Sequence, residues 1–305
     1  MAKKSGNKPK VKKVALSFKQ SISLAVGLAV ILLGVSGWLY WDRILMNPDR
    51  ALQDMLGRSL QTTSVTKVVT QTGAKQAVRL NYESEPLVRG VTILSQNNQA
   101  GGSSVTTETL GTKQADYVRY TNIATNGQPT PGVEEVLNIW ATQDNNIGLE
   151  ARPVFLNEAS LSLIPFGNLS DADKQKVVDA ANSRQVYSYE ATKTKWVRGR
   201  PVIIYSMNIK PADLIEVLKT YSEVTGIGDE NQLRSEDYIN ARNLTVEIAI
   251  DAFSRQLVNI SYPDAGRNEE YNGYGVKNTV NLPEQTISVV ELQSKIQNLA
   301  RQQPQ

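Results

Sequence analysis

The chain has 305 residues, with 33 Lys and Arg against 30 Asp and Glu, and it contains neither Cys nor His. Without Cys there can be no disulfide, thiol nucleophile, iron–sulfur cluster or thiolate zinc site, and without His there can be no Ser-His-Asp triad and no usual proton shuttle at neutral pH. The composition therefore favours binding over catalysis, and we expect no cofactor and no metal site.

The net charge of +3 combines two regions of opposite sign. Residues 1–21 hold seven Lys, among them Lys12, Lys13 and Lys19, and no acidic residue. The rest of the chain keeps the other 26 basic residues against all 30 acidic ones, a net of −4. We expect residues 1–21 to form a basic cytoplasmic tail, and the acidity of the remainder, without a basic stripe, argues against nucleic acid as a partner.

Residues 22–41 read ISLAVGLAVILLGVSGWLYW, twenty positions without a charge. As a helix this segment is about 30 Å long, the thickness of the hydrocarbon core of a bilayer. Trp38, Tyr40 and Trp41 lie at one end, where amphipathic rings favour the headgroup zone, and the Lys-rich tail lies at the other. The pattern predicts a single-pass helix in the cell membrane with a cytoplasmic amino terminus and an extracytoplasmic remainder.

A cleaved signal peptide is the competing interpretation, because it too has a basic region before an apolar one. The apolar run here exceeds the ~7 to 15 residues usual for such a peptide. The best small-residue site, Val35-Ser36-Gly37, is followed by the bulky Trp38. The sequence favours an uncleaved anchor, and an acylated Cys anchor is excluded.

After a short linker, residues 42–49, we expect one extracytoplasmic domain over residues 50–301. Asn47-Pro48-Asp49 opens an amphipathic helix over ALQDMLGRSL. After this helix, apolar residues recur at every second position, which is typical of antiparallel strands with one buried face. The expected strands are 64–71, 77–83, 91–95, 105–110, 117–124 and 137–142.

The second half of the domain mixes helices and strands. A short helix is expected over 156–164, a second over 171–183 with Ser170 as N-cap, and a third from Pro211 to Gly226. The remaining elements are strands at 185–193 and 201–209, a hairpin of 244–251 with 256–262, a last strand at 275–281 and a terminal helix at 287–300. Consecutive strands with few helices predict an α+β fold, a large curved antiparallel sheet covered by helices.

Several phrases of the sequence resemble the LolA-like and LppX/LprG-like envelope lipoprotein domains. They are ALQDMLGRSLQTTSVTKVVTQ, RPVIIYSMNIKPADLIEVL, LTVEIAIDAFSRQLVNISY and GYGVKNTVNLPEQT. Ile250-Asp251 matches the family's Ile-Asp at a hairpin turn, and Pro283 matches its strand that enters a Pro. The resemblance spans roughly residues 48–290 and implies a half barrel closed by helices on its concave side, with an apolar cavity between sheet and helices. The chain departs from the family in its spanning helix, which replaces a lipid anchor, and in longer loops at 96–104 and 125–133.

Large apolar side chains on the expected strands are candidates for lining such a cavity, although core packing alone would also place them inside. The candidates are Trp140, Tyr187, Tyr189, Trp196, Ile204 and Tyr205.

Catalytic motifs are weak in this chain. Ser64-Val65-Thr66-Lys67 matches S-x-x-K, but it falls on an expected strand and no K-T-G follows. Paired carboxylates such as Glu134-Glu135, Glu269-Glu270 or Asp171 with Asp173 would need to face one cleft to act as acid and base.

Three functions follow from these observations. The first is a membrane-anchored, non-enzymatic binding domain that holds a lipid or lipidated molecule in a concave apolar cavity. The second is an envelope sensor or interaction module with a filled core and a protein partner. The third is a carboxylate-dependent hydrolase, which requires two inward-facing acids in one cleft.

Overall fold

The computed structural model describes residues 32–98, 101–145, 154–227, 233–277 and 279–302. The chain divides after Asn47 into two units. In the first unit, residues 32–40 are helical and lead into a π-helical turn, η1 (Trp41–Leu45). The aromatic side chains of Trp38 and Tyr40 are exposed there.

Part of the predicted membrane segment falls outside this description. Residues 1–31, with Lys12, Lys13, Lys19 and the first ten positions of the predicted span, lie outside the described residues. Within the described ranges, no helix is both long and apolar enough to cross a membrane.

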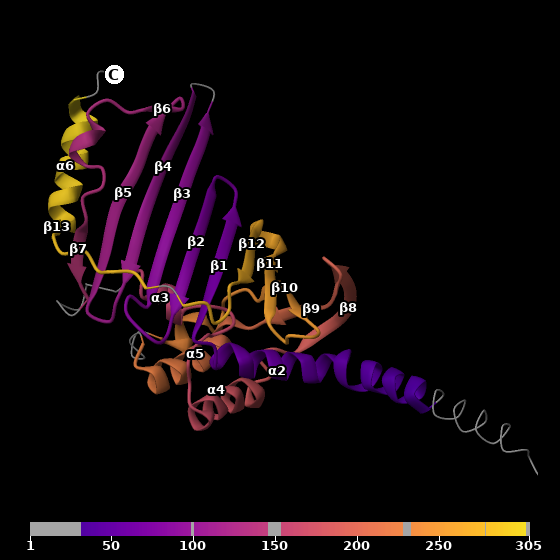
Figure 1. Cartoon of the computed structure of the whole chain (residues 1–305). Helices are drawn as coiled ribbons and strands as arrows, with labels where there is room; N and C mark the ends of the chain where they lie inside the picture. The colour runs from indigo at the N-terminus through magenta and orange to yellow at the C-terminus, as the bar shows by residue number, and fades with distance from the viewer. Residues whose placement is uncertain (1–31, 99–100, 146–153, 228–232, 278, 303–305) are drawn as a thin grey trace, which may run out of the picture. The chain divides into compact units, whose positions relative to one another are not determined.

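The second unit, from Pro48 on, is built on one sheet of 13 strands in the order β13-β7-β5-β4-β3-β2-β1-β12-β11-β10-β9-β8, with β6 beside β5 (Figure 1). Neighbouring strands are antiparallel except β13 and β7, which are parallel. The first strands are β1 (Ser64–Gln71), β2 (Ala74–Asn81), β3 (Val88–Asn98), β4 (Gly101–Gly111), β5 (Ala115–Thr125), β6 (Gln128–Pro129) and β7 (Ala141–Asp144). The others are β8 (Tyr189–Val197), β9 (Arg200–Ile209), β10 (Leu244–Asp251), β11 (Leu257–Tyr262), β12 (Arg267–Asn272) and β13 (Ile287–Ser288). The expected α+β class with a large, open, mostly antiparallel sheet is confirmed.

The helices of this unit are α2 (Pro48–Leu60), α3 (Asn157–Ser160), α4 (Asp171–Ser183), α5 (Pro211–Thr225) and α6 (Val289–Gln302), with short 3-10 turns η2 (Val133–Glu135), η4 (Ser235–Tyr238) and η5 (Pro263–Ala265). The predicted helix signals are confirmed: Ser170 accepts the backbone N–H of Asp173 at 3.2 Å, and α5 starts at Pro211 and is capped by Gly226, whose φ of 61° glycine adopts without a steric cost.

The main core lies where α2, α4 and α5 cover one face of the sheet (Figure 1). The helix α2 buries Leu52, Met55 and Leu56 on its apolar side. Facing it are side chains that are fully buried, among them Tyr205, Met207, Ile209, Ile248, Phe166 and Tyr221. At about 1.5–3 kcal/mol for each large apolar side chain removed from water, this layer supplies most of the stability of the unit.

A second, smaller core lies beside the other end of the sheet, where α6 covers β5 and β7 (Figure 1). Its buried members are Val133, Val136, Ala141 and Leu292. The partly buried residues around them include Val118, Tyr120, Ile296 and Leu299. The helix α6 is therefore held by contacts separate from those of α2.

Two expected elements are wrong, one strand was missed, and two expected strands are displaced along the chain. The strand expected at 137–142 is β7 (Ala141–Asp144), and the strand expected at 185–193 is β8 (Tyr189–Val197). Residues 275–281 are not a strand in their described part, because Gly273 and Gly275 take φ values of 61° and 67° and turn the chain away from extended geometry. The strand that joins β11 to β1 is instead β12, which the hydrophobic pattern missed because it directs the charged Glu269 inward beside Tyr271. The helix expected over 156–164 shortens to the four residues of α3.

Candidate functional site: an apolar hollow on the open face of the sheet

A row of paired residues that crosses four strands forms the floor of the candidate site. Ile204 on β9 pairs with Ala249 on β10, and Ala249 pairs with Asn259 on β11. Asn259 in turn pairs with Glu270 on β12. Because directly opposite residues of a sheet point to the same face with their Cβ atoms about 5 Å apart, these side chains form one continuous surface.

This surface lies on the sheet face that is opposite the helices. The neighbour of Ile204, Tyr205, donates its hydroxyl to the carbonyl oxygen of Pro48 in α2 at 2.7 Å. Successive side chains of a strand point to opposite faces, so Ile204 points away from α2. The floor therefore belongs to the face that α2, α4 and α5 leave open.

The hollow above this floor has a volume of about 430 Å³, within the roughly 300–1,000 Å³ usual for ligand sites. Its apolar lining comes from β8 to β12 and consists of Val197, Val202, Ile204, Ala249, Val258 and Tyr271. Its polar lining consists of Lys195, Arg198, Arg200, Asp251, Asn259, Glu270 and Asn272. The hollow thus combines an apolar wall with polar and charged margins.

Cations gather at the turn between β8 and β9, at one end of the hollow. Arg198 and Gly199 have φ values of 50° and 76° and close the hairpin in two residues, a turn whose twist matches that of the strands. Arg200 is paired with Asp251 at 3.1 Å. Lys195 and Arg198 are exposed and have no acidic partner within 4.0 Å among the described residues. They are available to a negatively charged ligand.

Asp251 stabilises the margin of the hollow where β10 ends. Its Oδ1 accepts the backbone N–H groups of Phe253 at 2.9 Å and Ser254 at 2.7 Å, which closes the turn to β11. Burial raises the pKa of Asp251, but the hydrogen bonds from Ser254 and Phe253 and the Arg200 guanidinium outweigh burial and bring the pKa below its ordinary value. Asp251 is therefore a structural anion.

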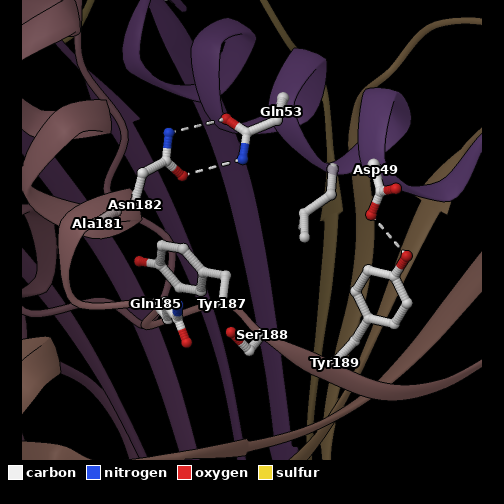
Figure 2. A pocket seen from close by; sticks show the side chains of 9 residues that line it. Asp49, Gln53, Ala181, Asn182, Gln185, Tyr187, Ser188 and Tyr189 are labelled. Carbon is white, nitrogen blue, oxygen red and sulfur yellow. Dashed lines mark hydrogen bonds between the residues drawn. The ribbon is translucent and has the colours of Figure 1, made fainter.

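A second hollow, of about 310 Å³, lies where α2, α4 and the segment before β8 meet (Figure 2). Gln53 donates its amide to Asn182 at 3.0 Å, and Tyr189 donates its hydroxyl to Asp49 at 2.6 Å. This hydrogen bond, followed by burial and the charge of Asp49, raises the pKa of Tyr189. The polar groups that line this second hollow largely bond to one another. The second hollow also has less apolar lining than the hollow on β8–β12.

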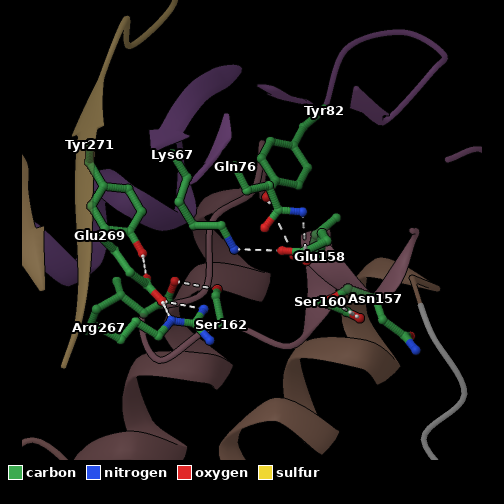
Figure 3. Close-up of polar contacts among 12 residues, drawn as sticks. Lys67, Gln76, Tyr82, Asn157, Glu158, Ser160, Ser162, Arg267, Glu269 and Tyr271 are labelled. Carbon is green, nitrogen blue, oxygen red and sulfur yellow. Dashed lines mark hydrogen bonds and ion pairs between the residues drawn. The ribbon is translucent and has the colours of Figure 1, made fainter. Parts of the chain in front are cut away.

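Buried charges lie on the helix-covered face of the sheet (Figure 3). Lys67 on β1 contacts Glu158 of α3 at 2.8 Å, and Glu269 on β12 contacts Arg267 at 2.6 Å. Tyr271 donates its hydroxyl to Glu269 at 2.5 Å, and its pKa is raised well above the usual value by burial and then by the Glu269 charge.

Two acids, Glu158 and Glu269, thus lie on this face, as the hydrolase hypothesis requires, but each is paired with a cation. The Lys67–Glu158 pair links α3 to the sheet. Across the described part of the chain, no group of three or more acidic side chains is placed to hold a metal ion.

The structure distributes the six predicted cavity residues over several places. Tyr187 and Tyr189 line the hollow of Figure 2, and Tyr189 packs edge-to-face on Tyr205 at 5.3 Å between ring centroids. Ile204 lines the hollow on β8–β12. Trp196, on the exposed β8, is 61% exposed.

Trp140 lies near the other end of the sheet, with the Arg119 guanidinium 4.5 Å from its ring centroid. It lines a further hollow of about 410 Å³ with Ile139 and Ile287. The six residues therefore do not form one cavity, and whether any of them contacts a ligand stays a prediction.

Most residues of the hollow were missed by the sequence analysis. A usable signal lay in Val202, Ile203, Ile204 and Tyr205, which are apolar at consecutive positions and so make both faces of β9 apolar. A strand with two apolar faces presents apolar surface that has to be covered on each side of the sheet.

Comparisons with known proteins give resemblances among solved structures. No family model matches the chain, and no curated protein matches it. Among solved structures, the chain is similar to LprF from Mycobacterium bovis, at 14% identity and a TM-score of 0.39, over 78% of this chain and 98% of that one.

Proposed function

We propose that this chain is a membrane-anchored, extracytoplasmic and non-enzymatic binding protein that holds a lipid or lipidated molecule in the hollow on β8–β12. One observation carries the proposal: an apolar wall shares a hollow of about 430 Å³ on an open sheet face with Lys195 and Arg198, two cations that have no acidic partner among the described residues. The anchor and the orientation rest on the uncharged segment 22–41 and the Lys-rich tail before it.

The two parts of the lining suit the two parts of an acyl-bearing anion. Val202, Ile204 and Ala249 would cover methylene groups, each of which gains roughly 0.8 kcal/mol on leaving water. Lys195 and Arg198 would neutralise a phosphate or carboxylate at the margin. Molecules without a chain or without a negative group would use only half of the lining.

The proposal is tested by filling the hollow. Ala249→Trp would place an indole on the floor, and Ala77→Trp is the matched control because Ala77 lies exposed on the same sheet face through the pairs Glu270–Val68 and Val68–Ala77. The full chain and both variants are purified from cells that supply natural lipids and are analysed by native mass spectrometry and lipid extraction.

We expect a bound acyl species in the wild type and in Ala77→Trp, and its loss in Ala249→Trp. The same lipid content in all three proteins would contradict a site in this hollow. Absence of any acyl species from the wild type would contradict the cargo role itself.

An envelope interaction module with a filled core is the second candidate. The space between sheet and helices favours it, because Tyr205, Tyr221, Phe166 and Met55 fill the place where the family resemblance implies a cavity. This candidate predicts that wild type and Ala249→Trp carry no lipid and that the open sheet face contacts a protein instead.

A further inference from the structure

We propose that the end of the sheet formed by the β8–β9 turn and the β10–β11 turn, residues 195–200 with Phe253, docks on the surface of an anionic phospholipid bilayer. This surface is called the sheet tip below. The inference rests on the proposed function in one respect only, that the ligand of the hollow is taken from this bilayer.

The two turns of the sheet tip lie side by side. Trp196 pairs with Pro201 across the β8–β9 hairpin. The carbonyl oxygen of Pro201 accepts the backbone N–H of Ala252 at 3.0 Å, and Phe253 is the next residue. Segments more than fifty positions apart in sequence therefore form one surface.

The sheet tip exposes the side chains that favour a membrane interface. Trp196 is 61% exposed, Phe253 47% and Val197 38%. The indole ring of Trp196 favours the headgroup zone, where its apolar part contacts acyl chains and its N–H contacts water, and Phe253 and Val197 add apolar surface beside it. The contact of these exposed apolar side chains with water is unfavourable, and docking on a bilayer surface would remove this contact.

The positive charge of the sheet tip favours an anionic bilayer over other membrane surfaces. Lys195, Arg198 and Arg200 lie within six residues, and only Arg200 has an acidic partner among the residues described, Asp251 at 3.1 Å. Each Lys or Arg close to a negatively charged leaflet gains roughly 1 kcal/mol, about a fivefold change in the docking equilibrium. The apolar and basic side chains occur together, as in interfacial membrane-binding segments.

The sheet tip and the hollow share residues. Val197, Arg198 and Arg200 line the hollow and also belong to the tip, so a docked tip would open the hollow toward the lipid surface. The turn also contacts α2, since Arg255, two residues after Phe253, lies 3.5 Å from Asp54. In the sequence, α2 starts seven positions after Trp41, so the linker from the proposed anchor is short.

The absence of Cys from the chain allows a direct test with single-Cys labels. Phe253→Cys is labelled with the fluorophore NBD, which takes the place of the ring, and Gln128→Cys on β6, in the opposite part of the sheet order, is the matched control site. The full chain is reconstituted in vesicles of phosphatidylcholine alone or with an equal part of phosphatidylglycerol, each with nitroxide-labelled phospholipid as quencher.

We expect quenching at position 253 to be several-fold stronger than at position 128 in the anionic vesicles and to weaken in phosphatidylcholine alone or in high salt. Lys195→Gln with Arg198→Gln should lower the docking equilibrium by about fivefold for each charge, whereas Lys75→Gln with Arg301→Gln, an equal loss of charge elsewhere, should not. Circular dichroism establishes that each variant is folded.

Equal quenching at positions 253 and 128 in anionic vesicles would overturn the docking proposal, whatever lipid extraction gives. Quenching at 253 that is the same in both vesicle types and survives loss of the two cations would overturn the anionic partner. Docking by a chain whose hollow carries no acyl species would overturn the cargo role and leave docking supported.

Discussion

Asp251 illustrates how single polar residues determine the shape of the hollow. It is 5% exposed, and its carboxylate accepts hydrogen bonds from two backbone N–H groups of the β10–β11 turn. The same turn presents Phe253 at the sheet tip. A buried anion in the body of the fold therefore sets the geometry of an exposed aromatic side chain.

The lowered pKa of Asp251 gives a signed prediction for stability against pH. Because the folded-state pKa lies below the unfolded value of about 3.9, the contribution of Asp251 is fully present above that unfolded value and is lost as pH falls through the folded pKa. Asp251→Asn should lower the free energy of unfolding by about 1–2 kcal/mol at neutral pH, since charge-assisted hydrogen bonds to the turn become neutral. Urea unfolding of the full chain in a nonionic detergent measures this value.

The control is the same comparison in acid. As pH falls through the lowered folded-state pKa of Asp251, the wild-type carboxyl becomes protonated, so the difference between wild type and Asp251→Asn should shrink. A difference that stays constant from neutral pH to acid would show that the carboxylate charge does not stabilise the turn.

At the scale of elements, α6 depends on a small core of its own. Leu292 is 2% exposed in the cluster with Val133, Val136 and Ala141, whereas Val290 on the same helix is 71% exposed. Leu292→Ala should destabilise α6 by about 2–3 kcal/mol, because truncation of a buried Leu removes contacts and leaves a cavity. Hydrogen exchange should show lost protection in α6 and β7 and unchanged protection in β9 and β10.

Val290→Ala is the matched control on this helix and should leave exchange unchanged. An equal loss of protection in β9 and β10 after Leu292→Ala would mean that the two cores unfold together.

Much of the order of elements could be predicted from the sequence. Strands with apolar side chains on one face were found where alternation was clean, as in β1 and β10, whose predicted bounds agree with the structure. The helices α4 and α5 were found from Ser170, Pro211 and Gly226, residues whose local geometry determines helix ends.

The features that were missed depend on contacts that form only in the folded chain. β12 carries Glu269 on its inner face, which becomes acceptable only because Arg267 and Tyr271 neutralise and bond it in the folded chain. The candidate site was missed for the same reason, since Arg198 and Asp251 line one hollow only through the pairing of β9 with β10. Pairing of this kind leaves no periodic trace in a single sequence.

At the scale of the whole molecule, charge divides the chain into unequal parts. The +7 of residues 1–21 and the −4 of the remainder stand on the two sides of the uncharged segment 22–41. Cytoplasmic flanks retain Lys and Arg, and acidic residues contribute little to orientation. The proposed topology therefore depends on the tail and hardly on the acidity of the larger unit.

Replacement of all seven Lys of residues 1–21 by Gln should invert or mix the orientation of the proposed anchor, because the charge bias that retains the tail in the cytoplasm is removed. Single Cys residues at position 2 and at the exposed Gln128 report the side of each end through a membrane-impermeant maleimide on intact cells. We expect label at position 128 alone with the natural tail, and label at position 2 in a fraction of the neutralised chains. The matched control exchanges seven Lys or Arg for Gln beyond residue 50 and should keep the original pattern. The same one-sided labelling with and without the seven Lys would contradict a topology determined by the tail.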